Sequence, residues 1–397
     1  MMKVLFVDDE PQVLRGLSRV LSFMSEEWDM EFVCGAQEAL VLMEREAIDV
    51  IVTDLRMPGI NGAELLARVL ERWPGTVRII LSGHADPEIT LRTVGVAHLF
   101  LTKPCEPELL VSTITRVYAL CTLLNNEALR KLVQSMKSLP SQPTLHNQIL
   151  STLQQQDISM QKIGELVDQD AGMTARILQL VNSSFFGQQR HISSATQAIS
   201  LLGLDIIRSL VLSLGVFSQI EPGLASKFPL EKVWQHSMRV GKFAREIARS
   251  EGQSRLVLED AFASGLLHDA GKLVLAANLP IPYAQALALV KLKKIPVEEA
   301  ERTTMGASHA EVGAYLMGLW GLPNPIVEAM AYHHQPLPVH GTAFCALTAV
   351  HVANYLDHEC NSADSIACIT PLNMEYLTSL GLVSRIPIWS DLCRAIQ

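Results

Sequence analysis

The stretch Gly265-Leu266-Leu267-His268-Asp269-Ala270-Gly271-Lys272 puts a histidine next to an aspartate within an apolar, helix-like run. Burying an ionised carboxylate in such a run costs several kcal/mol unless a cation or a set of hydrogen bonds compensates it. One compensation is a divalent metal ion shared by the imidazole and the carboxylate. The other is a single hydrogen bond between the two side chains in a helical core. The dipeptide alone leaves both open.

Four more histidines lie on other helix-like segments of the same region: His236, His309, His333 and His334. Each of them alone could be a core or hydrogen-bonded residue. Together with His268 and Asp269, they can converge on one point of a helical bundle. Imidazole and carboxylate ligands suit Zn, Fe, Ni or Mn. The sequence therefore predicts a site for one divalent transition metal.

Helical spacing of apolar residues dominates the chain from Thr144 onward, and strand-like alternation is almost absent. Residues 141–397 are therefore predicted to form an all-α domain. Its expected helices are Ile149–Gln156, Met160–Asp168, Met173–Asn182, Thr196–Leu202, Ile206–Val216, Val233–Ser250, Leu258–Ala276, His309–Leu319, Pro325–Tyr332 and Thr342–Asp357.

The first 124 residues instead alternate short apolar runs with amphipathic segments. The runs predict strands at Lys3–Val7, Met30–Cys34, Val50–Thr53, Val77–Leu81 and His98–Thr102. The segments predict helices at Gln12–Phe23, Ala36–Glu46, Gly62–Arg72, Pro87–Val94 and Glu106–Leu124. Strands that are apolar throughout are typical of a parallel sheet covered on both faces. The sequence thus predicts an α/β domain with a doubly wound, five-stranded parallel sheet.

Polar residues follow four of these strands: Asp8 and Asp9, Asp54, Ser82, and Lys103. In a doubly wound sheet, the carboxyl ends of the strands meet at one edge, where functional groups gather. Clustered carboxylates raise one another's pKa unless a cation is present, and Mg²⁺ prefers carboxylate oxygens. A carboxylate beside Mg²⁺ can attack a phosphoryl group, while a lysine and a hydroxyl hold the transferred oxygens.

The stretches around these residues resemble the receiver domain of bacterial response regulators, over about residues 1–124. They are Val7–Glu10, Asp54–Gly62, Leu81–His84 and Phe100–Pro104. The resemblance implies phosphorylation of Asp54 by a cognate sensor histidine kinase. It also assigns the remaining roles: Mg²⁺ ligands Asp8, Asp9 and Asp54, phosphoryl contacts Ser82 and Lys103, and the aromatic switch residue Phe100.

The histidines and the aspartate, in this order, resemble the HD superfamily of metal-dependent phosphohydrolases. The surrounding stretches are similar to the HDOD family, the HD-related output domain of bacterial signalling proteins, over roughly residues 130–360. They are Leu139–Pro143, Ile163–Val167, Asp170–Thr174, Leu178–Gly187 and Ala198–Gly203. This resemblance implies an output domain that is mostly non-hydrolytic and acts through protein–protein interaction. The partner would be a GGDEF or EAL enzyme, a kinase or another signalling protein.

Several residues depart from the pattern of the hydrolytic members. Enzymes of the superfamily that hydrolyse cyclic dinucleotides read Ala-Asp-x-x-Asp on the last core helix, whereas this chain has Asn354 at the first aspartate. Lys232 stands where a glutamate is expected, and no Gly-Tyr-Pro follows His334. Lys272, one turn after His268, is nevertheless suited to contacting a phosphate. The alternative function, a metal-dependent phosphohydrolase or cyclic-dinucleotide phosphodiesterase, therefore stays open beside the binding module.

The segment 125–140 is predicted to be a helical connector. After its first turn, residues 106–136 contain no glycine or proline, so one helix of about 30 residues, roughly 45 Å long, is expected. Such a helix would be a stiff link and a candidate for a coiled coil in a homodimer. The alternative is two helices with a break at Asn125-Asn126.

The charge, the apolar stretches and the cysteines of the chain bear on its partners and its cellular compartment. The net charge is −9 and no Lys/Arg run occurs, which argues against direct nucleic-acid binding. The most apolar stretch, 198–217, carries Asp205 and Arg208, so buried helices are expected rather than a membrane span. No signal peptide is expected from the first residues. Seven cysteines without a CxxC pair fit reduced thiols in the cytoplasm.

Overall fold

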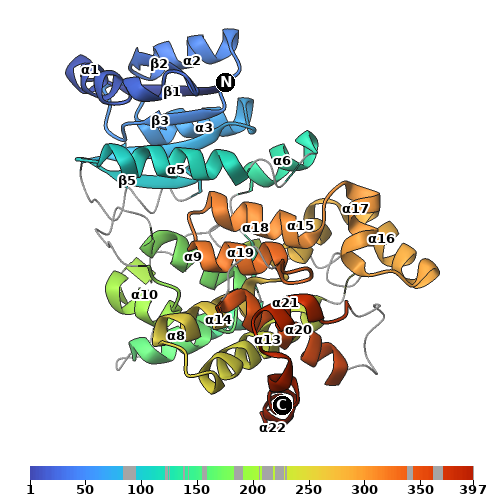
Figure 1. Cartoon of the computed structure of the whole chain (residues 1–397). Coiled ribbons are helices and arrows are strands. Elements are labelled where there is room, and N and C mark those ends of the chain that lie inside the picture. The colour runs from blue at the N-terminus through green and yellow to red at the C-terminus, as the bar shows by residue number, and fades with distance from the viewer. Residues whose placement is uncertain are drawn as a thin grey trace.

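A computed structural model gives the fold of the chain, with an α/β domain at the N-terminus and a larger helical domain after it (Figure 1). The described residues are 1–83, 95–120, 124, 126–136, 139–141, 143–153, 159–182, 191–204, 206–207, 218–219, 228, 230–337, 343–360 and 370–396. Among them, no helix is both long and apolar enough to cross a membrane.

The N-terminal domain is built on a five-stranded parallel sheet in the order β2-β1-β3-β4-β5. Its strands are β1 Met2–Asp8, β2 Trp28–Cys34, β3 Val50–Thr53, β4 Val77–Ser82 and β5 Leu99–Thr102. Every residue of β3 and β4 is buried, which explains why these runs are mostly apolar, although β4 also contains the buried Arg78. The predicted doubly wound parallel sheet is confirmed.

Helices cover both faces of the sheet (Figure 1). They are α1 Pro11–Val20, α2 Ala36–Arg45, α3 Gly62–Arg72 and α5 Pro107–Leu120. The first was expected to reach Phe23, but it ends at Val20 and a 3₁₀ turn, η1 Ser22–Met24, follows it. The helix predicted at Pro87–Val94 lies outside the described residues.

The prediction of one continuous connector helix is wrong. Helix α5 ends at Leu120, and α6 Glu127–Gln134 begins anew after Asn126, as in the alternative of two helices. Asn126 has a non-helical backbone, and its side-chain oxygen accepts a hydrogen bond from the backbone N–H of Leu129, which caps α6. Its amide also donates to the Met305 carbonyl of the helical domain at 3.1 Å. The break is therefore held by capping and by the second domain.

The C-terminal domain is helical, as predicted. Its helices are α7 Pro143–Leu153, α8 Met160–Val167, α9 Ala171–Val181, α10 Ala195–Leu202, α13 Leu230–Ser250, α14 Arg255–Leu267, α15 Ala270–Asn278, α16 Pro280–Lys293, α17 Val297–Met305, α18 His309–Leu319, α19 Asn324–Tyr332, α20 Ala346–Cys360, α21 Met374–Ser379 and α22 Ile386–Ala395, with a 3₁₀ turn, η6 Val383–Arg385. A short parallel pair of strands, β6 Pro140–Ser141 and β7 Ser218–Gln219, completes it. Most of the helix expected at 206–216 lies outside the described residues.

The single helix predicted at Leu258–Ala276 is two helices, α14 and α15, that meet at His268 and Asp269. His268 Nδ1 donates to the Gly265 carbonyl at 2.7 Å, and Asp269 takes a non-helical conformation as the residue before α15. The spacing of apolar residues does not reveal the break between α14 and α15, because the residues on both sides of it are buried and mostly apolar. Helices α16, α17, α21 and α22 were not anticipated.

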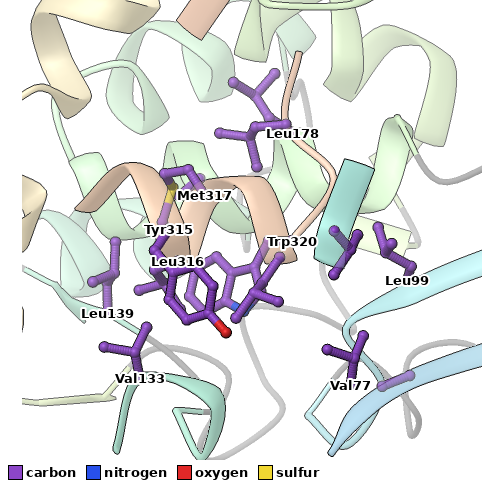
Figure 2. Close-up of a cluster of buried hydrophobic side chains, with 14 of the residues drawn as sticks. Val77, Leu99, Val133, Leu139, Leu178, Tyr315, Leu316, Met317 and Trp320 are labelled. Atoms are coloured by element: carbon purple, nitrogen blue, oxygen red, sulfur yellow. The ribbon is translucent and has the colours of Figure 1, made fainter. Parts of the chain in front are cut away.

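The two domains share a hydrophobic contact. Figure 2 shows Val77 and Leu99 of the first domain on one side of Trp320, which directly follows α18, and Val133 of α6 on the other side near Tyr315. The contact is tight, because a Cβ added to Gly318 of α18 would collide with the Leu120 side chain of α5. The two domains therefore pack directly against each other at this face.

Buried polar groups cross the same contact. Arg78 of β4 is 1% exposed, and its Nη2 donates to the Gln134 carbonyl of α6 at 2.8 Å. The Nδ1 atom of His98 accepts from the Arg78 backbone, and its Nε2 atom lies 2.9 Å from the same Gln134 carbonyl. Gln134 Nε2 in turn donates to the Tyr315 hydroxyl of α18 at 2.7 Å. Burial, and after it the charge of Arg78, lowers the pKa of His98 well below its usual value, so this imidazole is neutral.

Candidate functional site

The carboxyl edge of the sheet brings Asp8, Asp54 and Lys103 together. Lys103 Nζ donates to Asp8 Oδ2 and to Asp54 Oδ1, both at 2.6 Å. Burial would lower the pKa of Lys103, but the hydrogen bonds to Asp54 and Asp8 raise it above its usual value. The second oxygen of Asp54 accepts from the Arg56 backbone N–H at 2.7 Å. Asp54 is thereby fixed within this cluster of Asp8, Asp54 and Lys103, here called the acidic pocket, and is 8% exposed.

The other predicted residues of this pocket lie on the sheet strands or directly after them. Ser82 ends β4 and Phe100 lies in β5, and both side chains are buried. Asp9 follows Asp8 directly and is partly exposed. Asp8 and Asp54 share a single ammonium group here, and Asp9 adds a third carboxylate next to Asp8, so the donor set has room for a further cation. Carboxylate oxygens suit Mg²⁺, which Asp8, Asp9 and Asp54 would hold, and which would offset the charge of a phosphoryl group near Asp54.

A second cluster lies in the helical domain, where close helix packing positions it. A Cβ added to Gly265 of α14 would lie 2.7 Å from the Cα of Gly241 in α13, so these two helices cross in direct backbone contact. A Cβ at Gly271 of α15 would collide with the His309 carbonyl at the start of α18. These contacts bring the His268–Asp269 junction against His236 on one side and His309 on the other.

All five predicted histidines converge on Asp269. Two groups have ligand atoms within 4.8 Å of one another: His236, His268 and Asp269, and His309, His333 and His334. Asp269 lies between them, because its Oδ1 is 3.2 Å from His309 Nε2 and its Oδ2 is 3.7 Å from His236 Nε2. His309 Nε2 and His334 Nε2 are 3.0 Å apart. The structure thus brings the predicted residues into two adjoining groups of possible ligands, and the metal itself stays a prediction.

Four of the imidazoles are oriented from behind through Nδ1. His268 Nδ1 lies 2.7 Å from the Gly265 carbonyl and His333 Nδ1 lies 2.8 Å from the Met330 carbonyl. His309 Nδ1 lies 2.6 Å from Glu301 Oε2, and His236 Nδ1 lies 2.7 Å from Asp357 Oδ2. These oxygens can only accept, so Nδ1 carries the proton and Nε2 is left to act as a ligand. Such backing is typical of histidines that bind metals.

The electrostatics of the cluster also suit a cation. Burial lowers the pKa of His268 to about 4 and lowers the pKa values of His333 and His334 well below the usual value. Burial would raise the pKa of Asp269, but the charges of His268 and Lys272 hold it well below its usual value. His309 differs, because Glu301 overcomes the effect of burial and raises its pKa to about 9. A metal ion would compete with the proton on His309.

The two remaining predicted residues are also close to the cluster. Asn354 Oδ1 lies 3.1 Å from His236 Nε2, so the amide occupies a position beside the first group of ligands. Lys272 Nζ donates to Asp269 Oδ2 at 2.7 Å, which engages the ammonium that was expected to contact a phosphate. Lys272 and Asn354 both line a cavity next to the cluster that measures only about 40 Å³.

Sequence reasoning missed several charged groups of this centre. Glu301 and Asp357 hold histidines from behind, Glu298 lies 3.8 Å from His334 Nδ1, and Arg239 Nε donates to Asp357 at 2.6 Å. The spacing of Glu298 and Glu301 in the sequence could have indicated that they are buried. They recur three residues apart on the face of α17 that carries the buried Met305, where apolar residues would be expected.

Two family models match the chain. The response regulator receiver domain matches residues 4–115, and the HDOD domain matches residues 139–336. Among curated proteins, an uncharacterized protein of Treponema pallidum (strain Nichols) is 26% identical over 196 residues, covering 49% of this chain. The hydrogenase transcriptional regulatory protein HoxA of Cupriavidus necator is 41% identical over 113 residues, covering 28% of this chain. The matches span 37% and 23% of those proteins' own lengths.

Among solved structures, the MmoQ response regulator from Methylococcus capsulatus strain Bath is 26% identical. It superposes with a TM-score of 0.49 and covers 64% of this chain and 98% of its own. An HDOD domain protein with unknown function from Geobacter sulfurreducens is 24% identical, with a TM-score of 0.35, and covers 72% of this chain and 93% of its own.

Proposed function

Because the chain belongs to the response regulators in which a receiver domain is followed by an HDOD domain, we propose that phosphorylation of Asp54 controls the HDOD domain. The donor is a cognate sensor histidine kinase in the cytoplasm, and the output is a changed surface presented to a downstream signalling protein. The single observation that carries this proposal is the pocket in which Lys103 Nζ binds both Asp8 and Asp54 at 2.6 Å.

The proposed route from the pocket to the output domain is the sheet itself. Strand β4 ends at Ser82 in the pocket and begins at Val77 in the domain contact. Strand β5 leads from Leu99 in the contact towards Lys103 in the pocket. A strand of five or six residues spans about 17–20 Å, so a change at the pocket can reach the contact through rigid elements. The connector segment is not one continuous helix, and this route does not require it.

The proposal predicts a measurable change at the contact. Beryllofluoride with Mg²⁺ mimics the phosphoryl group and should lower the hydrogen-exchange protection of the amides in α18. The reason is that the receiver would then pack differently against Gly318 and Trp320. Protection of α22, which lies far from the contact, should stay constant. Unchanged protection of α18 in a protein that binds beryllofluoride would contradict the proposed route.

We further propose that the histidine centre holds one divalent transition metal in a structural role rather than a hydrolytic one. Its support is the size of the adjoining cavity, about 40 Å³, which accommodates a water molecule or two. Sites for drug-sized ligands measure about 300–1,000 Å³. In addition, Asp357, the second aspartate of the superfamily pattern, is engaged by His236 and Arg239.

The purified chain should accordingly show no turnover of cyclic di-GMP or of a generic phosphodiester with Mn²⁺, Fe²⁺ or Ni²⁺ added. The physical reason is that the substrate cannot reach the centre through so small a cavity. Product formation is measured by chromatography, with and without beryllofluoride. Robust turnover that His268→Ala removes would overturn the structural role and support the phosphodiesterase alternative.

The five cysteines that the structure describes are all unpaired, which supports a reducing compartment. The proposed downstream partner is a GGDEF or EAL enzyme or a kinase, and the proposed assembly of the regulator is a homodimer. Capture of a defined candidate partner by the wild type with beryllofluoride, compared with Asp54→Ala, tests the binding function directly.

A further inference from the structure

Helix α17 carries three glutamates that differ sharply in their surroundings. Glu298 is 2% exposed and Glu301 is 0% exposed, whereas Glu299 between them is exposed. Residues three apart lie on the same face of a helix, so Glu298 and Glu301 both point towards the histidine centre while Glu299 points away. Two buried carboxylates on one helix face need positive partners, because each costs several kcal/mol to desolvate.

Glu301 is committed to His309. Its Oε2 accepts hydrogen bonds from the His309 backbone N–H at 2.7 Å and from His309 Nδ1 at 2.6 Å. Its Oε1 is buried and has no hydrogen-bond partner among the residues that the structure describes. This carboxylate therefore fixes the ring of His309 with Nε2 towards Asp269, and it leaves part of its own charge unbalanced.

Glu298 stands behind His334 in a looser arrangement. Its Oε1 accepts from the Thr370 hydroxyl at 2.7 Å and lies 3.8 Å from His334 Nδ1. Its Oε2 and His334 Nδ1 are both buried and lack hydrogen-bond partners within the described part of the chain. The other nitrogen of His334 faces His309 Nε2 at 3.0 Å. A small rotation of His334 would let Nδ1 donate to Glu298, as Nδ1 of His309 does to Glu301.

The charges around the centre do not balance without a cation. Its carboxylates are Asp269, Glu298, Glu301 and Asp357, and its fixed cations are Lys272 and Arg239. With every histidine neutral, two negative charges remain, and one divalent ion that displaces the extra proton of His309 would balance them. The position of Asn354 lacks the aspartate of the hydrolytic superfamily members, but the missing charge is present elsewhere, on a helix that the superfamily pattern does not single out.

We propose that Glu298 and Glu301 of α17 are positioning residues for a single divalent metal ion at His309, His333 and His334. Glu301 orients His309 and Glu298 orients His334, so that the Nε2 atoms point at the ion. Both carboxylates supply from behind the negative charge that Asn354 does not. This inference rests on the proposed metal site and adds the groups that set its affinity.

The test uses the full chain, stripped with a chelator and titrated with Co²⁺ against a competing chelator. Its ligand-field absorption reports coordination without any enzymatic assay. Glu301→Gln and Glu298→Gln keep the shape and an accepting oxygen but remove the charge, and the exposed Glu299→Gln is the matched control. Removing such an orienting carboxylate typically weakens metal affinity about 10–100-fold. We expect Glu301→Gln to weaken Co²⁺ affinity by about 100-fold and Glu298→Gln by about 10-fold. Glu299→Gln should leave the affinity unchanged.

The outcomes distinguish a failure of the proposed metal site from a failure of the proposed positioning role. If the wild type does not bind Co²⁺, the proposed metal site itself is wrong. If the wild type binds Co²⁺ and both buried variants bind it equally well with the same spectrum, the positioning role is wrong. Thermal unfolding of the metal-free variants identifies a general folding defect. Should Glu301→Gln not fold, Glu298→Gln alone decides the question.

Discussion

Asp54→Ala is expected to abolish incorporation of phosphate from acetyl phosphate and binding of beryllofluoride. Asp54 Oδ1 accepts from Lys103 Nζ at 2.6 Å and Oδ2 accepts from the Arg56 backbone at 2.7 Å, so its carboxylate is held at the centre of the pocket. Alanine removes the only group there that would attack phosphorus under the proposed function. Acid-labile phosphate and beryllofluoride-dependent changes in tryptophan fluorescence are the measurements.

A matched control is Asp49→Ala, because Asp49 is an exposed carboxylate in the same domain whose Oδ2 accepts from the Lys3 backbone. It should be labelled as the wild type is. Equal labelling of Asp54→Ala would show that another residue accepts the phosphoryl group. Loss of labelling in both variants would point to a folding defect of the receiver, which circular dichroism detects.

Gly318→Leu is expected to separate the receiver from the output domain. The added side chain would collide with Leu120 of α5, and Gly318 has ordinary helical geometry, so α18 itself is not strained. Overpacking of this kind costs about 1–3 kcal/mol, which changes the ratio of docked to undocked molecules by about 5- to 150-fold. Amides of α5 and α18 should lose protection in hydrogen exchange, and beryllofluoride should then have little further effect on α18.

Gly16→Leu is the control for this experiment, since Gly16 lies in α1 and nothing stands within 4 Å of a Cβ at that position. Its exchange pattern and its response to beryllofluoride should match those of the wild type. If Gly318→Leu keeps full protection of α18 and a normal response, the contact seen around Leu120 does not hold the domains together.

The receiver and its pocket were accessible from the sequence because their determinants are local. Each strand is a short apolar run, and Asp8, Asp54, Ser82 and Lys103 follow or end their strands directly. Parallel topology then carries them to one edge without further information. The convergence of the five histidines was likewise predictable, because each lies at the end or on the buried face of a helix with a clear apolar pattern.

Other features depend on tertiary contacts that no local pattern records. The break before α6 is fixed by Asn126, whose amide reaches Met305 far along the chain. The carboxylates of Glu298 and Glu301 were missed because acidic residues on a short helix usually face water, and α17 itself was not expected. Arg78 lies in an otherwise mostly apolar strand, and no local pattern shows that one of its partners is the Gln134 carbonyl of the connector helix α6.

That arginine limits how freely the two domains can be recombined. A receiver grafted from another regulator would bring its own residues to the positions of Arg78 and His98, both of which reach the Gln134 carbonyl. Without matching donors, this buried carbonyl would be left unpaired, at a cost of about 1–3 kcal/mol. Chimeric regulators should therefore lose communication between their halves unless both residues are transplanted together, so the modules would be inherited as a matched set.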